Sequence, residues 1–244
     1  MYKKIQMLKY NKFRKKYREY ILEGKRLIQS ALDCKIKLNS IVCTNLFEKE
    51  NQFWLETIAN NQVYYETITN KQFQKLATTQ TPSGIAATCD IPEERKPDFS
   101  SNHWLFLDKI SDPGNMGSLL RSAAWFGIKN IALSPGCVDP FNPKVVRSGM
   151  GAHFTISIYS KIQLTQFSDT HQIIAGEHRG EDTSLYKFPK KHVLVMGNEA
   201  WGISKELVKD IDKFISINKH GSGESLNVAS AGAILMYLSS FAEK

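Results

Sequence analysis

Short apolar runs recur through the second half of this 244-residue chain. Each is only a few residues long, and helix-length segments separate several of them. The runs lie at residues 104–107, 131–133, 154–158, 173–175, 193–196 and 214–217. Short, nearly continuous apolar strands that alternate with helices are typical of a parallel sheet covered on both faces. The pattern therefore predicts an α/β fold with helices on both faces of a parallel sheet.

A charged segment bounded by prolines divides the chain. Residues 91–97 read Ile-Pro-Glu-Glu-Arg-Lys-Pro, and two prolines so placed exclude a continuous helix or a central strand. Before this segment, strands are expected at residues 20–22, 40–43, 62–65 and 84–89, and helices at residues 25–34, 53–59 and 70–77. We therefore expect a small N-terminal α/β domain over residues 1–95 and a second domain over residues 96–244.

The charge balance favours a polyanionic partner. The chain has 32 Lys and Arg against 24 Asp and Glu, a net charge of +8, and such a field attracts polyanions. Cations are dense in the first 26 residues, where tyrosines are interleaved with them. These tyrosines are Tyr2, Tyr10, Tyr17 and Tyr20. Two interpretations stay open: an RNA contact with phosphate binding beside stacking surfaces, or a solvated helix face with tyrosines half in the core.

Other sequence features narrow the class. No segment approaches the roughly 18 consecutive apolar residues of a membrane span. The four cysteines lie far apart without a Cys-x-x-Cys pair, which indicates neither a disulfide framework nor a zinc site. We expect a cytoplasmic protein that binds no membrane and no metal.

Three glycine-bearing loops follow expected strands, at residues 112–117, 197–202 and 218–223. In parallel sheets, ligands bind outside the carboxyl ends of the strands. After the first loop we expect a helix from near Gly117, with Arg121 about one turn into it. A helix N-terminus and a guanidinium together favour an anion; the alternative is an ordinary surface arginine.

The second and third loops carry isolated polar groups. The segment from Gly197 to Gly202 lacks the Lys-Ser/Thr of a phosphate-binding loop, and no dinucleotide fingerprint is present, so Glu199 stands as a single carboxylate. Trp201 either stacks on a ligand or fills the core, and the core is the favoured interpretation. In the third loop, Ser222 or Ser225 is expected to cap a helix. Asn227, placed in the first helical turn, indicates a polar contact.

In their order and spacing, these segments resemble the SpoU (TrmH-like) branch of the SPOUT RNA methyltransferases. The first motif of that family matches Asn115, Gly117 and Arg121. The second, Gly-x-Glu-x-x-Gly, matches the loop around Glu199, and the third, Ser-Leu-Asn-Val, is present at residues 225–228. The likeness extends to residues 81–86 and 142–152, and so spans nearly the whole chain. One departure is Ile217-Asn218, where family members commonly have Ile-Pro.

The resemblance implies a fold and a chemistry. It implies a deep trefoil knot in the C-terminal domain, an N-terminal substrate-binding domain and a homodimer. The donor would be S-adenosylmethionine, the substrate a ribose 2′-hydroxyl of RNA, and ribosomal RNA is favoured over transfer RNA. The implied catalytic residues are Arg121, Asn115, Glu199, Ser225 and Asn227. The implied donor-binding residues are Gly197, Gly202, Ile217, Leu226 and Asn227.

The role of Arg121 stays open, because a guanidinium has an ordinary pKa above about 12. It acts either as an unusually perturbed base or as an electrostatic clamp on the hydroxyl and the adjacent phosphate. Two other functions are also compatible with the sequence. One is an RNA- or ribosome-binding protein that keeps the fold without activity, and the other is a relative that methylates a base.

Overall fold

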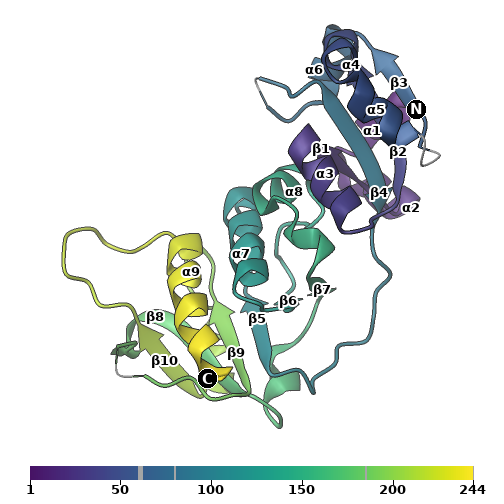
Figure 1. Cartoon of the computed structure of the whole chain (residues 1–244). Helices are drawn as coiled ribbons and strands as arrows, with labels where there is room; N and C mark the ends of the chain where they lie inside the picture. Colours follow the sequence, from purple (N-terminus) through teal and green to yellow (C-terminus); the bar gives the residue numbers. More distant parts are fainter. Residues whose placement is uncertain (60–62, 80, 185, 244) are drawn as a thin grey trace. The chain divides into compact units, whose positions relative to one another are not determined.

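The computed structural model describes residues 1–59, 63–79, 81–184 and 186–243. The chain divides into two compact units, shown in Figure 1. The first combines Met1–Glu93 with Phe141–Phe154, and the second combines Glu94–Pro140 with Thr155–Lys244. Residues 141–154 therefore leave the second unit and return to it. A single division of the sequence between residues 95 and 96 does not include this excursion, and the independence of domains with those bounds stays a prediction.

The first unit is built on a four-stranded mixed sheet in the order β1-β4-β2-β3. β4 pairs antiparallel with both β1 and β2, while β2 and β3 are parallel. The strands are β1 (Glu19–Glu23), β2 (Leu38–Thr44), β3 (Tyr65–Ile68) and β4 (Ile85–Asp90). The expected strands at 20–22, 40–43 and 84–89 are confirmed. The one at 62–65 falls partly outside the described residues, and β3 begins only at its last position.

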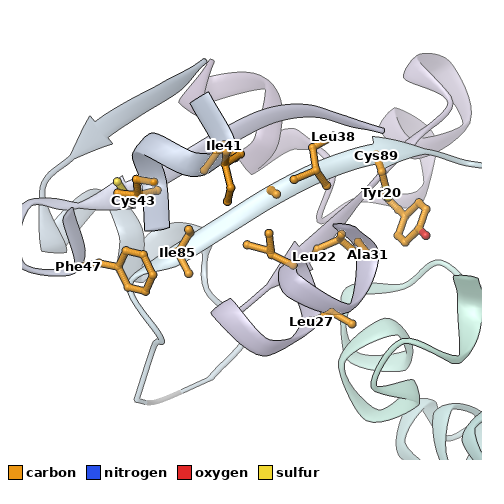
Figure 2. Packing of buried hydrophobic residues seen from close by; sticks show 14 of the residues in the cluster. Tyr20, Leu22, Leu27, Ala31, Leu38, Ile41, Cys43, Phe47, Ile85 and Cys89 are labelled. Carbon is orange, nitrogen blue, oxygen red and sulfur yellow. The ribbon is translucent and has the colours of Figure 1, made fainter. Parts of the chain in front are cut away.

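Helices pack on both faces of this sheet because its side chains alternate between two cores. Tyr20 and Leu22 of β1 join the core drawn in Figure 2, whereas Ile21 between them faces the other core. The helices of this unit are α1 (Tyr2–Met7), α2 (Asn11–Tyr17), α3 (Lys25–Asp33), α4 (Asn45–Glu50), α5 (Gln52–Ala59), α6 (Asn70–Leu76), α8 (Pro143–Gly149) and the 3-10 turn η1 (Ala152–Phe154). Val146 of α8 belongs to the first of these cores, which explains why the excursion belongs to this unit.

The second unit contains a six-stranded sheet in the order β10-β8-β9-β5-β6-β7, and every neighbouring pair is parallel. Its strands are β5 (His103–Leu107), β6 (Asn130–Leu133), β7 (Ser157–Ser160), β8 (Gln172–Asp182), β9 (His192–Met196) and β10 (Lys213–Ser216). The predicted α/β class with a C-terminal parallel sheet is thus confirmed. The expected strand at 154–158 was placed too early, because η1 ends at Phe154 before β7 begins.

The two faces of this sheet are covered differently. Helices α7 (Pro113–Trp125) and α9 (Val228–Ser239) pack against each other, and α9 also lies on β8 and β9. The opposite face holds Trp104 and Phe106 in a second apolar cluster with Phe167 of the 3-10 turn η2 (Leu164–Phe167). The turn η3 (Val208–Asp210) follows Leu207, which also packs there, and the turn η4 (Ser240–Glu243) follows α9. Helices therefore cover both faces, but those on the second face are short 3-10 turns.

Helices α7 and α9 approach each other closely at a glycine. A Cβ built on Gly232 of α9 would lie 2.4 Å from Cδ2 of Leu119 in α7. A larger residue would require the Leu119 side chain to move, so the small residues in this part of α9 favour the close approach. Because α7 follows β5 and α9 follows β10, their packing draws together the loops that precede them.

Among the described residues, no helix has the length and hydropathy that crossing a bilayer requires.

Candidate active site

The three glycine-bearing loops lie at the carboxyl edge of the parallel sheet in the second unit. They follow β5, β9 and β10, which end at Leu107, Met196 and Ser216. Residues 217–227 form a long loop before α9 (Figure 1). The side chains of residues 218–227 in this loop are exposed. The edge is where ligands bind in folds of this kind.

Helix α7 begins earlier than expected. Its N-cap is Asp112, whose Oδ1 accepts a hydrogen bond from the backbone N–H of Asn115 at 2.7 Å, and Pro113 occupies the first turn. Proline is favoured there because its missing N–H has no partner in a helix anyway. The expectation of a start near Gly117 was therefore wrong. Arg121 lies about two turns into the helix rather than one.

Glu199 is the centre of a hydrogen-bond network at this edge. Its Oε1 accepts from the backbone N–H of Asp112 at 3.1 Å and from Nδ2 of Asn115 at 3.2 Å. Its Oε2 accepts from Ser111, through the backbone N–H at 3.3 Å and the hydroxyl at 3.1 Å, and from Nδ2 of Asn198 at 3.2 Å. A single carboxylate thus ties the loop after β9 to the start of α7.

These donors also fix the charge state of the carboxylate. Burial alone raises the pKa of Glu199, but the hydrogen bonds from backbone N–H groups and from Asn115 outweigh it. The pKa of the carboxyl is therefore held below its ordinary value. Glu199 is an anion at neutral pH. Its lone pairs are largely engaged within the protein, which suits it to positioning rather than to taking up a proton.

Asn227 connects the third loop to the same network. Its Nδ2 donates to Oδ1 of Asn115 at 2.9 Å. Its own Oδ1 accepts from the backbone N–H groups of Ala229 and Ser230, so Asn227 is the N-cap of α9. The expectations that it lies inside the helix and that a serine caps it were wrong, although the expected polar contact is present. Asn115, Glu199 and Asn227 come together as a chain of three side chains.

The loop after β9 is held by its own backbone. Asn198 and Gly202 exchange N–H···O bonds of 2.8 and 2.9 Å, and the Asn198 side chain accepts from the N–H groups of Ala200 and Trp201. A Cβ on Gly197 would lie 2.4 Å from the carbonyl carbon of Gly202. The loop therefore requires glycine at residue 197 for close packing. At residue 202 glycine is favoured by the backbone conformation instead, because φ is +67°.

Sequence reasoning missed four residues that build this edge. Asp108, almost fully buried, accepts from the hydroxyl of Ser134 at 2.9 Å and from the backbone N–H of Ser204 at 2.8 Å. Asn198 donates to the carbonyl of Lys109 at 2.7 Å. Ser111 and Asp112 bind Glu199. All four are polar residues in the loops that follow β5 and β9, and this position at the carboxyl edge was the signal that could have revealed them.

The remaining candidates are not joined to the network. Arg121 is exposed and, in the described part of the chain, forms no ion pair or side-chain hydrogen bond. Ser225 and Leu226 lie exposed in the loop before α9, and Ile217 is half-buried at its start. Trp201 is 88% exposed, so the favoured expectation of a core residue was wrong. Its indole is available to a ligand.

The edge combines features that suit a nucleoside-type methyl donor. Gly202 is exposed while Gly197 packs beneath it, and the half-buried Ile217 and the exposed Leu226 offer aliphatic surface for a purine. The residues present fit such a group. No cluster of three metal-ligating side chains occurs among the described residues. A parallel α/β unit whose edge suits such a donor, joined to a mixed-sheet unit, defines this protein as a two-unit α/β methyltransferase.

Comparison with known families identifies the chain more closely. Residues 102–237 match the SpoU rRNA methylase family, and residues 2–87 match the MRM3-like substrate binding domain. A curated relative from Bacillus subtilis, the 23S rRNA (guanosine(2553)-2′-O)-methyltransferase RlmP, is 30% identical over 93% of this chain and 90% of its own. The chain belongs to the SpoU rRNA methylase family.

Solved structures agree with this assignment. A putative RNA methyltransferase of the TrmH family from Porphyromonas gingivalis has 28% identity and a TM-score of 0.82, over 98% of this chain and 96% of that one. An AdoMet-bound rRNA methyltransferase from Sinorhizobium meliloti has 26% identity and a TM-score of 0.79, over 98% and 93% of the two chains. Both likenesses extend over the two units.

Proposed function

We propose that this protein transfers a methyl group from S-adenosylmethionine to a ribose 2′-hydroxyl of ribosomal RNA. The observation that carries the proposal is the network of Asn115, Glu199 and Asn227, which joins all three motif loops at one edge of the sheet. Support comes from family membership, from the ribosomal 2′-O-methyltransferase of Bacillus subtilis and from the AdoMet-bound relative.

When bound, the donor supplies an electrophilic methyl on a sulfonium, so the protein has no need to activate a leaving group. The protein must place the hydroxyl in line with that methyl, and positioning of this kind contributes up to roughly 7–11 kcal/mol. Gly197, Gly202, Ile217, Leu226 and Asn227 would hold the donor. Glu199 and Asn115 fix the loops that carry these contacts.

Arg121 is proposed as an electrostatic clamp on the reacting ribose and its phosphate. Its guanidinium is exposed and has no carboxylate partner in the described part of the chain, so its donors are available to an anion. Arginine suits this role because its planar fork matches phosphate oxygens. Ser225, two residues before Asn227, is proposed to contact the substrate from the loop before α9.

The active form is proposed to be a homodimer. Helix α9 and the turn η4 carry aromatic and aliphatic side chains at the surface: Tyr237 is 51% exposed, Ile234 40% and Phe241 45%. Tyr237 contacts Phe126 and Phe241, with ring centroids 5.8 and 4.9 Å away. A contiguous apolar patch of this kind is typical of an interface. A cytoplasmic location is also proposed, because the relative from Bacillus subtilis is a bacterial protein that acts on ribosomal RNA.

The proposal is tested with RNA that lacks the modification. Purified protein, labelled S-adenosylmethionine and separated ribosomal and transfer RNA are incubated, and the product is digested to nucleosides for mass spectrometry. Label in a 2′-O-methylnucleoside from ribosomal RNA supports the proposal. Label in a methylated base identifies a base-modifying enzyme instead. Absence of both label and donor binding indicates an RNA-binding protein without activity.

A further inference from the structure

Helix α2 carries positive charge that no described acidic residue neutralises. Lys12, Lys15 and Lys16 are exposed, and none has an acidic partner within salt-bridge distance among the described residues. The first acidic residue of the chain is Glu19. It is buried and already accepts Nζ of Lys4 at 2.6 Å. The three ammonium groups therefore face solvent as an uncompensated cluster.

Aromatic rings lie beneath and beside these charges. Phe13 and Tyr17 stack one helical turn apart, with centroids separated by 6.3 Å and planes inclined by 13°. Nζ of Lys12 lies 4.9 Å from the Phe13 centroid, and Nζ of Lys16 lies 5.4 Å from that of Tyr17. Cation–π contacts of this length hold ammonium groups in place. Tyr10, the N-cap residue of α2, is 63% exposed and presents a further ring.

A buried arginine makes this surface rigid. Arg14 is only 2% exposed, and its Nη1 donates to the carbonyls of Leu8 and Lys9 at 2.8 and 2.9 Å. It thereby fastens the end of α1 to α2, while Leu8 is buried in the core beneath. Arg14 is a structural residue and is not free to bind RNA. The backbone that carries the exposed lysines and rings is consequently held in place, which lowers the entropic cost of binding.

We propose that this surface, the α2 platform (Tyr10, Lys12, Phe13, Lys15, Lys16 and Tyr17), binds a single-stranded segment of the RNA substrate. The lysines contact phosphates, and an unpaired base stacks on the exposed ring of Tyr10. Exposed rings favour single strands because the bases of a duplex are not accessible for stacking. The inference rests on the proposed function and assigns part of its substrate recognition to one helix.

The test uses the full-length protein and a labelled single-stranded oligoadenylate of about twelve nucleotides, a length within the usual site size. The variant Lys12→Ala/Lys15→Ala/Lys16→Ala is expected to bind it about tenfold more weakly at low salt. The dependence of log K on log salt should fall by about two, because each lost phosphate contact removes about 0.7. Tyr10→Ala is expected to weaken binding about tenfold, whereas Tyr10→Phe, which keeps the ring, binds like wild type.

A matched triple variant distinguishes the effect of the α2 lysines from the effect of total positive charge. Lys129→Ala/Lys190→Ala/Lys209→Ala removes the same charge from exposed positions of the second unit and is expected to keep wild-type binding. Equal losses in both triple variants, or wild-type binding by the α2 variant, would overturn the platform. Tighter binding of a duplex of equal length would overturn the single-strand assignment. The α2 variant should retain donor affinity, which shows that it is folded. Loss of donor binding by the wild type would count against the proposed enzyme and leave the platform to be judged by RNA binding alone.

Discussion

Nδ2 of Asn227 donates a hydrogen bond to Oδ1 of Asn115 at 2.9 Å, joining two residues that are far apart in the sequence. The bond links the N-cap of α9 to the first turn of α7, and Asn115 passes the connection on to Glu199. In each side-chain amide both the oxygen and the nitrogen form hydrogen bonds. The oxygen of Asn227 caps its own helix, and the nitrogen of Asn115 donates to the carboxylate of Glu199. The three motif loops are thereby fixed relative to one another before any ligand binds.

Asn227→Asp is expected to separate the two roles of this residue. Aspartate keeps the capping oxygen, so the unfolding free energy should stay close to that of wild type. The variant loses the donor to Asn115 and places a carboxylate against its carbonyl oxygen. Methyl transfer should fall roughly 10- to 100-fold, the equivalent of a lost hydrogen bond with an unsatisfied partner. Asn227→Ala should lose the same activity and also about 1 kcal/mol of stability. Wild-type transfer by Asn227→Asp would contradict this assignment.

Gly197→Ala is expected to disrupt the loop after β9. The added methyl would lie 2.4–2.6 Å from backbone atoms of Gly202 and Ile203, and backbone cannot move aside as a flexible side chain does. Donor affinity measured by calorimetry should fall at least tenfold. Gly127→Ala, outside the proposed site, is the matched control, since its Cβ would meet nothing within 4 Å and only its positive φ of +79° is unfavourable. The control should lose about 1 kcal/mol of stability; an equal effect on donor binding would refute the packing explanation.

Structural features that depend on a short stretch of sequence could be predicted from the sequence alone, whereas features that depend on tertiary packing could not. The strands at Trp104 and Val193 are apolar runs, and their burial follows directly from composition. The pairing of Asn115 with Asn227 could be anticipated only through the family motifs, because it depends on how α7 packs against α9. Trp201 was assigned to the core since tryptophan is usually buried, yet the loop's own hydrogen bonds turn it outward. The trefoil knot has no local signature and stays a prediction from the family.

The free energy of unfolding should depend on pH through His192. This side chain is fully buried beside His103, with ring centroids 4.7 Å apart, and burial lowers its pKa to about 4. Because the folded-state pKa lies below the unfolded value of 6.5, the stabilisation is complete above pH 6.5. It should decrease as the pH falls from 6.5 towards 4, by about 3 kcal/mol in all.

Chemical denaturation at a series of pH values measures this effect. His192→Phe should remove most of the pH dependence between 6.5 and 4, although it also loses the hydrogen bond to the carbonyl of Pro189. The exposed His178 provides a control, and His178→Gln should leave the wild-type profile unchanged. A profile for His192→Phe as steep as that of wild type would show that another group is responsible.

Tyr237→Glu is expected to dissociate the proposed homodimer. A carboxylate in the apolar patch at the end of α9 would have to be buried without a partner, which costs several kcal/mol. Sedimentation analysis should show a dimer for wild type and a monomer for the variant at the same concentration. Phe53→Glu alters an exposed aromatic residue of the first unit, outside the patch, and should remain a dimer. A monomeric wild-type protein would refute the proposal.

The central claim is that Arg121 acts on the reacting ribose at the edge of the parallel sheet. The most direct measurement compares methyl transfer to unmodified ribosomal RNA by wild type and Arg121→Ala at saturating donor and RNA. Because Arg121 is exposed and lacks an internal partner among the described residues, the unfolding free energy should change by less than about 0.5 kcal/mol. The turnover rate should fall about 10²- to 10³-fold, as for removal of a key electrostatic donor. Wild-type turnover by Arg121→Ala, with 2′-O-methylnucleoside still formed, would contradict the account.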